Sequence, residues 1–220
     1  SVDGTVTLNG TVASSDDALT FGAVTLGNNV IIDTNSTTTN RADITIAAIT
    51  GGSNTLTLTT ENNVTGSDVT ASGAISGVTT LTLASVGGTA TLSGDVDVTT
   101  LTVGNTVANV AFTGNGSTVT NSFTPDNDGT FIFGASGGTQ TYNGGLTTTS
   151  VDGTVTLNGS LVTSDDALTL GAATLASDVT LTSAGGAIVT GAITGTSATD
   201  DLTVTSSGGS TNTISLGAIG

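Results

Sequence analysis

Apolar and hydroxyl-bearing residues alternate along most of the chain. The pattern is clear in Thr5-Val6-Thr7-Leu8, in Leu56-Thr57-Leu58-Thr59 and in Leu202-Thr203-Val204-Thr205. A period of two gives an extended strand one apolar face and one polar face. No segment keeps the spacing of three and four residues that an amphipathic helix requires, and no apolar run reaches about 18 residues. The sequence therefore predicts an all-β protein with no membrane-spanning segment.

Turn residues separate the expected strands at short intervals. Gly, Asn, Asp and Ser fill the gaps, and these residues accept turn conformations with positive φ. Paired apolar positions recur at a nearly constant interval, at Val6/Leu8, Leu19/Phe21, Val30/Ile32, Ile44/Ile46 and Leu56/Leu58. We therefore expect a repeated strand-and-turn module of about 12 residues, a spacing typical of all-β repeats and domains.

A much longer repeat is superimposed on this module. Residues 1–30 recur at 150–179, and 21 of the 30 positions are identical. We expect one full long repeat over residues 1–149, with a less regular, Phe-containing stretch at 104–149. Residues 150–220 are the first half of a second copy. Because the chain opens at a repeat start and stops within a unit, we interpret it as a piece of a longer array.

Two architectures fit short strands at regular intervals. In a parallel β-helix, or β-solenoid, two or three modules form a coil and each coil stacks on the previous one. In tandem immunoglobulin-like β-sandwich domains, the modules are antiparallel strands. Aromatic residues are only 3% of the chain, whereas sandwich cores depend on them. The length of the long repeat also suits an integral number of coils. The solenoid is the preferred prediction.

Composition excludes several kinds of chemistry. The chain has no His and no Cys, so it can provide neither imidazole or thiol catalysis nor metal ligation through nitrogen or sulfur of those residues. The net charge is −16 and Arg41 is the only Lys or Arg residue. Nucleic-acid binding through phosphate neutralisation is therefore not expected. The 51 Thr and 32 Gly residues fit solvated strand faces and turns.

Adjacent aspartates occur three times, at Asp16-Asp17, Asp165-Asp166 and Asp200-Asp201. Adjacent residues of a strand point to opposite faces, so each pair is a poor catalytic dyad. An Asp that precedes an apolar strand commonly closes a turn by accepting from nearby backbone N–H groups. We expect turn roles here and no enzymatic activity.

The run Pro125-Asp126-Asn127-Asp128-Gly129 is the sharpest local motif. Asp-x-Asp-Gly opens many oxygen-rich calcium loops, so Asp126 and Asp128 are candidate Ca²⁺ ligands. The later bidentate Glu of such loops is missing, and the same run also forms a good turn without a metal. No other cofactor is indicated.

Thr-x-Thr segments recur along the chain, as in Thr55/Thr57, Thr80/Thr82 and Thr100/Thr102. Outward threonines at one place on every coil would form a flat hydroxyl grid, which would suit an ice-binding β-solenoid. Thr is also simply a favourable polar residue for a solvated strand. The intervals between these segments are uneven, and we expect this to disrupt such a grid. Ice binding is therefore an alternative function and not the preferred one.

An aromatic group lies in the irregular stretch. Phe131-Ile132-Phe133 is the most hydrophobic part of residues 104–149, and Tyr142 lies in the same stretch. They could form a site where a partner docks or a locally wider core, and the core is favoured.

The segment DALTLGAATLASDVTLTSAGGAIVTGAITG (166–195) resembles the repeats of filamentous-haemagglutinin-type exoproteins and autotransporter passengers. The resemblance lies in the style of the repeat, and it implies a right-handed parallel β-helix on a bacterial surface. It carries over no catalytic residue.

We accordingly expect a non-enzymatic structural segment of a large secreted surface protein, either an adhesin stalk or an extracellular fibre. Its expected location is extracellular or on the bacterial cell surface. Expected partners are other copies, stacked end to end or in fibres, and a host-cell or polysaccharide target. The alternatives are an ice-binding solenoid and a calcium-dependent sandwich-type adhesin repeat.

Overall fold

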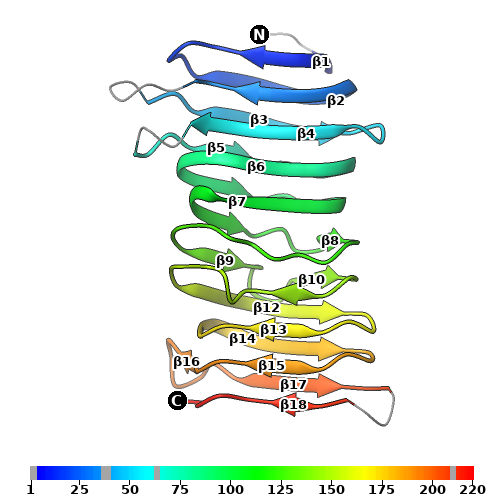
Figure 1. Ribbon diagram of the computed structural model, residues 1–220, viewed down its shortest axis with the longest axis vertical. Coiled ribbons are helices and arrows are strands. Elements are labelled where there is room, and N and C mark those ends of the chain that lie inside the picture. Colours follow the sequence, from blue (N-terminus) through cyan, green and yellow to red (C-terminus); the bar gives the residue numbers. More distant parts are fainter. Residues whose placement is uncertain (1–3, 36–40, 62–64, 209–211) are drawn as a thin grey trace.

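The chain folds as a parallel β-solenoid of about nine turns (Figure 1). The computed structural model describes residues 4–35, 41–61, 65–208 and 212–220, and no helix occurs in these ranges. Each strand pairing between named strands is parallel, as are both isolated bridges. The parallel β-helix prediction is confirmed. The sandwich alternative is wrong, because its strands would pair antiparallel.

Within the described ranges, eighteen strands form the coils. They are β1 (Val6–Ala13), β2 (Leu19–Asp33), β3 (Ile44–Thr50), β4 (Thr55–Glu61), β5 (Val69–Ala71), β6 (Ile75–Leu92), β7 (Val96–Phe112), β8 (Thr118–Val119) and β9 (Phe131–Phe133). They continue with β10 (Thr139–Tyr142), β11 (Leu146–Thr147), β12 (Val155–Thr163), β13 (Leu168–Leu170), β14 (Ala173–Ser183), β15 (Ile188–Thr190), β16 (Ile193–Gly195), β17 (Leu202–Ser206) and β18 (Ile214–Ser215).

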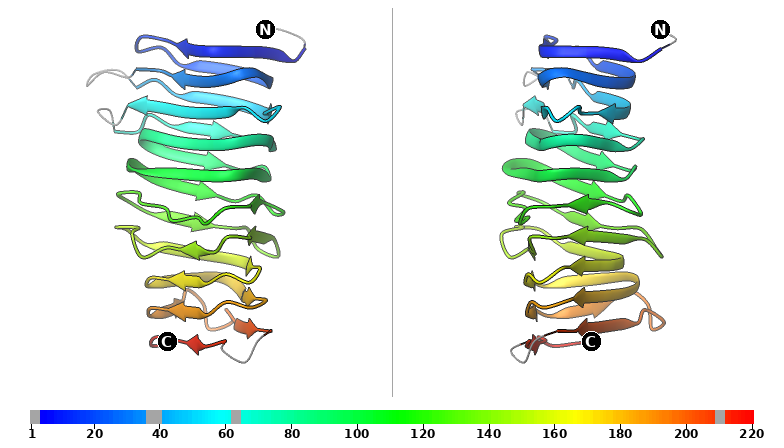
Figure 2. Two further views of the ribbon diagram at one scale, coloured as in Figure 1. Left: turned by 45° about the vertical axis from the view of Figure 1, so that its right-hand side comes forward. Right: turned by 90° about the vertical axis from the view of Figure 1, so that its right-hand side faces the viewer.

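Each coil has three sides, which we call faces 1, 2 and 3 in the order in which the chain visits them. Face 1 stacks Val6, Val24, Ile49, Ile75 and Val96, and continues through β8, β10, the second halves of β12 and β14, and β17. Face 2 stacks Gly10, Val30, Leu56, Leu81 and Leu101, and resumes at Phe123, β11, β13, β15 and β18. Face 3 stacks Leu19, Ile44, Val69, Ala90, Val110, Phe131, Val155, Ala173 and Ile193. The coils form one column in the turned views (Figure 2).

Coil length varies although the stacking is regular. The coil that leads from Val6 to its partner Val24 is clearly shorter than the one that leads from Ile49 to its partner Ile75. The corners and loops absorb the difference. The interval between paired apolar positions is therefore not the unit of the coil, because a coil contains three strand segments and the interval passes over some of them.

The two copies of the long repeat lie on different faces. Val6 is on face 1, whereas the corresponding Val155 is on face 3. Their local pairing is the same in both copies: Val6↔Val24 and Gly10↔Val30 in one, and Val155↔Ala173 and Gly159↔Val179 in the other, with a register shift between these two pairs each time. The second copy therefore starts two thirds of a turn beyond a whole number of coils. The expectation of an integral number is wrong, because a strand segment needs a neighbouring coil and not a particular face.

Glycines stack where face 3 turns into face 1. A Cβ built on Gly94 would lie 2.2 Å from the carbonyl carbon of Gly73, and one built on Gly114 would lie 2.5 Å from the carbonyl oxygen of Gly94. Gly is therefore required at positions 94 and 114, because the backbones of successive coils approach too closely there for a side chain.

We predict that Gly94→Ala lowers the free energy of unfolding by about 1–3 kcal/mol, because its methyl group must displace the Gly73 backbone. Gly22 lies at the equivalent corner, but nothing lies within 4 Å of its Cβ position. Gly22→Ala is the matched control and should be neutral or slightly stabilising, since it only restricts the unfolded chain. Urea unfolding followed by circular dichroism measures both. Equal losses for the two variants would contradict the close approach.

Candidate functional site

The candidate calcium ligands Asp126 and Asp128 are exposed at the corner between faces 2 and 3, while Asn127 between them is buried. The Asn127 amide Nδ2 donates to the carbonyls of Gly129 (2.9 Å) and Thr130 (3.0 Å), which closes the turn from within. Asp128 borders a groove of about 240 Å³, and Asp126 is not among the lining residues. In the described part of the chain, no three acidic side chains gather as metal ligands would. The calcium site stays a prediction.

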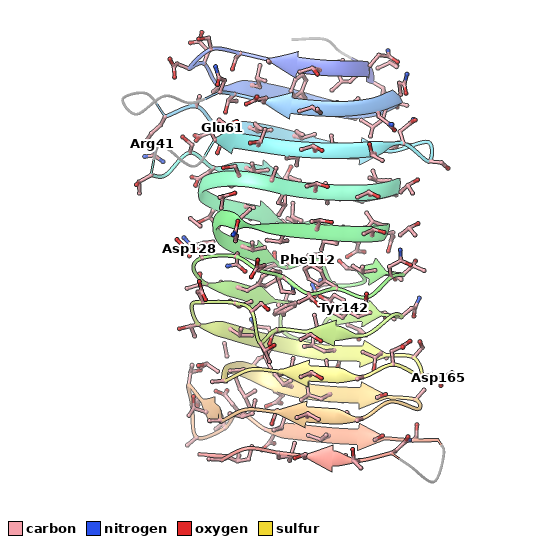
Figure 3. The ribbon with its side chains drawn as sticks, in the orientation of Figure 1. Arg41, Glu61, Phe112, Asp128, Tyr142 and Asp165 are labelled. Atoms are coloured by element: carbon pink, nitrogen blue, oxygen red, sulfur yellow. The ribbon has the colours of Figure 1, made fainter. Side chains whose placement is uncertain are left out.

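The aromatic residues considered for docking lie inside the coil. Phe131 and Phe133 are fully buried, and Tyr142 is 1% exposed. Figure 3 labels Tyr142 together with Phe112, which is also buried. Phe131 and Phe133 stack with ring centroids 4.1 Å apart, and Phe123 stacks on Tyr142 at 5.9 Å. Faces 1, 2 and 3 all contribute to this cluster. The favoured interpretation as core is correct, and these side chains offer no surface to a partner.

A buried polar pair accompanies the aromatic core. The Tyr142 hydroxyl donates to Gln140 Oε1 (2.9 Å), and Gln140 Nε2 donates to the Phe112 carbonyl (2.8 Å). Burial raises the pKa of the Tyr142 phenol well above its usual value of 10.0. Gln140 and Tyr142 are two residues apart, so the sequence predicts that their side chains share a face of the strand. Nothing in the sequence predicted that the polar side chain of Gln140 would be buried.

The paired aspartates occupy turns, as expected, although hydroxyls close two of them. Ser14 Oγ donates to the Asp17 carbonyl, and Thr163 Oγ1 donates to the Asp166 carbonyl at 2.7 Å. Asp200 Oδ2 accepts from the backbone N–H of Ser197 at 2.7 Å. Asp165 of one pair and the candidate calcium ligand Asp128 lie at opposite edges of the rod, so these two acidic turns do not converge (Figure 3).

Other Asp and Asn residues connect one coil to the next. Each stands directly before a buried Val or Ile and accepts a hydrogen bond from a backbone N–H of the following coil, at 2.7–3.0 Å. The pairs are Asn29–Thr55, Asp43–Asp68, Asp68–Thr89, Asp95–Gly116, Asn109–Thr130 and Asp178–Asp201. Part of the acidic charge thus marks corners where a side-chain oxygen extends the backbone ladder. Sequence reasoning expected bonds within a turn and missed these bonds between coils.

Outward threonines form aligned columns in spite of the uneven spacing in the sequence. On face 2, Thr55 pairs with Thr80 and Thr80 with Thr100, while Thr57 pairs with Thr82 and Thr82 with Thr102. We call these six residues the threonine patch. The expectation that irregular intervals would spoil a grid is wrong here, because the extra residues lie in loops and the strands keep their register.

The threonine patch is polar, uncharged and open to water. Its side chains are half-buried to exposed, and residues 53–60, 78–92 and 98–107, which contain it, include no charged side chain. Asn121 Nδ2 donates to Thr100 Oγ1 at 2.8 Å. Within the described residues, the other five hydroxyls of the patch make no side-chain hydrogen bond, so they are available to water or a ligand.

A groove of about 290 Å³ lies beside the patch, at the corner between faces 1 and 2. Ser53, Thr79, Thr99, Thr120 and Asp97 are among its lining residues. Thr79 Oγ1 donates to the Ser53 carbonyl at 2.8 Å, which fixes that hydroxyl to the preceding coil. The groove therefore extends the hydroxyl surface around the corner and brings one carboxylate to its edge.

Comparisons with protein-family models, with curated proteins and with solved structures give no match. The class of this protein is therefore defined by its own structure. It is a parallel β-solenoid repeat protein with acidic corners and hydroxyl-bearing faces. Within the described ranges, no helix is long and apolar enough to cross a membrane.

We predict that Asp95→Ala lowers the free energy of unfolding by about 1 kcal/mol, because the Gly116 N–H loses its acceptor. Asp95→Asn keeps an acceptor oxygen and should retain most of this stability, because Asn29 and Asn109 accept the same kind of inter-coil hydrogen bond at the other two corners. Denaturant melts of the three proteins test the pair. A loss as large for Asn as for Ala would show that charge, and not the inter-coil bond, stabilises the corner.

Tyr142 also predicts alkaline lability. Because the pKa of the Tyr142 phenol is raised in the folded chain, ionisation of this residue does not change the free energy of unfolding below pH 10. Above pH 10 it lowers that free energy by up to about 1.4 kcal/mol per pH unit. Because Tyr142 is the only Tyr, tyrosinate absorbance reports this residue alone. The tyrosinate absorbance of the native protein should appear only as the chain unfolds, whereas in urea it should appear near pH 10. Tyr142→Phe should remove this pH dependence. Ordinary titration of the folded protein near pH 10 would contradict the burial.

Proposed function

We propose that this chain is a structural, non-enzymatic segment of a large secreted bacterial surface protein, serving as an adhesin stalk or an extracellular fibre. The observation that carries the proposal is the parallel ladder, which continues through about nine turns. Each coil contacts only its neighbours, so added coils lengthen the rod without reorganising it. Such a body is suited to holding a distal part away from a surface.

The side chains support a mechanical role. Asp and Asn side chains that could have served chemistry instead bridge successive coils, as Asp43, Asp68 and Asp95 do. Buried columns such as Ile32–Leu58–Leu83 follow the axis and remove apolar surface from water at every turn. An external location is supported by the resemblance of the repeats to those of secreted adhesins. The near absence of Lys and Arg also removes cleavage sites for trypsin-like proteases.

Self-association along the axis belongs to the same proposal. A solenoid presents the unpaired backbone N–H and C=O groups of a strand edge at any coil that lacks a neighbour. Open strand edges pair readily with further strands, so we propose that copies stack end to end. The outward hydroxyls and the neighbouring groove are the surface that a neutral polysaccharide or host-cell glycan would meet.

Antibodies raised against this chain test the proposed location. They should label intact cells of the bacterium that encodes it, and immunoelectron microscopy should place the label away from the membrane. An antibody against a cytoplasmic protein serves as the control for cell integrity. Labelling that appears only after permeabilisation would contradict a surface rod.

A further inference from the structure

We propose that the threonine patch on face 2 binds ice. This inference concerns the surface of the solenoid and does not depend on its being an adhesin. Its starting point is the register: Thr55, Thr80 and Thr100 form one column, and Thr57, Thr82 and Thr102 form a second column two residues away. Between the columns, Leu56, Leu81 and Leu101 point inward and are buried, so both columns lie on the outer side of one sheet.

The spacing of the strand positions that carry the hydroxyls is close to that of ice. Successive coils lie about 4.8 Å apart, and alternate residues of a strand lie about 6.7 Å apart. In a tetrahedral water lattice with O···O hydrogen bonds of about 2.75 Å, oxygens that share a neighbour are separated by about 4.5 Å, and the repeat perpendicular to the layers is about 7.3 Å. Ordered water on the two columns can therefore continue into an ice lattice with small adjustments.

The threonine patch is also pre-organised for binding. Thr is β-branched, so its χ1 angle is restricted, and the strands that carry it are hydrogen-bonded to neighbouring coils. A surface already held in the bound geometry loses little side-chain entropy on binding. No charged group in residues 53–60, 78–92 and 98–107 holds its own competing hydration shell.

Neighbouring surfaces are less regular than the patch. Along face 2 the two columns give way to Asn29 and Ile31 on one side and meet Asn121 on the other. On face 1, the block Thr139/Thr141, Ser160/Val162, Thr180/Thr182 and Thr203/Thr205 is interrupted by Val162. Face 3 aligns a single column through Thr20, Thr45, Thr70 and Thr91. The structure therefore assigns the activity to face 2.

Thermal hysteresis and uptake of the purified chain into slowly grown ice test this inference. The unmodified chain should show hysteresis and enter the ice. Thr82→Tyr places a large ring in the middle row and should abolish most of both signals. Thr45→Tyr makes the same change on face 3 and should leave them intact. Tyr is favourable in strands, and circular dichroism verifies that each variant is folded.

If Thr82→Tyr does not fold, Thr57→Tyr replaces it, because Thr57 lies in an adjacent row of the same column. Loss of ice binding in the face 2 variant alone supports the proposal. Absence of hysteresis and of ice uptake in the folded, unmodified chain overturns it. Equal loss in the face 2 and face 3 variants also overturns it, because the activity would then not belong to the threonine patch.

Discussion

The spacing between hydrogen-bonded parallel strands, about 4.8 Å, is the constraint on which the structure depends. A strand residue that is paired in the ladder has a counterpart at that distance in the next coil, so its position must tolerate a close neighbour. Inside the coil, this requirement favours β-branched and small apolar residues that stack in columns. At the tightest corner it favours Gly, since Gly94 and Gly114 leave no room for a methyl group.

The same constraint explains the polar residues. Corner Asp and Asn side chains reach the backbone of the next coil because that backbone is always one strand spacing away. Outward threonines form columns for the same reason. The acidic charge is thus partly structural. The hydroxyl grid on face 2 follows directly from the ladder and requires no special local design.

Much of the fold could be predicted from the alternation of apolar and hydroxyl residues. The parallel coil, the core position of Phe131 and Phe133 and the turn role of the aspartate pairs all follow from residue type and period. The number of faces could not be predicted, because a segment such as Gly10–Ala13 lacks the paired apolar residues that marked the other strands, and the pair Val24/Leu26 falls between two of the recurring pairs.

Two errors concerned alignment between coils. The first error equated the interval between Thr-x-Thr segments in the sequence with their spacing along the solenoid axis, and it predicted irregular threonine columns. Loops absorb the difference in the number of residues between Thr57, Thr82 and Thr102, so the columns are aligned. A sequence repeat was also taken to imply a whole number of turns. The structure shows that Val6 and Val155 occupy different faces with the same local pairing, because the three faces make similar demands on the chain.

Disulfide trapping measures this interchange of faces most directly, since the natural chain has no Cys. The structure pairs Ile132 with Thr156 on face 3. At one strand spacing, two outward cysteines are within the Cα separation that a disulfide permits, about 4.4–6.8 Å. Ile132→Cys combined with Thr156→Cys should oxidise rapidly to an intramolecular disulfide. Thr141→Cys combined with Thr156→Cys should remain reduced, because Thr141 lies on face 1. The reverse result would place the second copy in phase with the first and contradict the account.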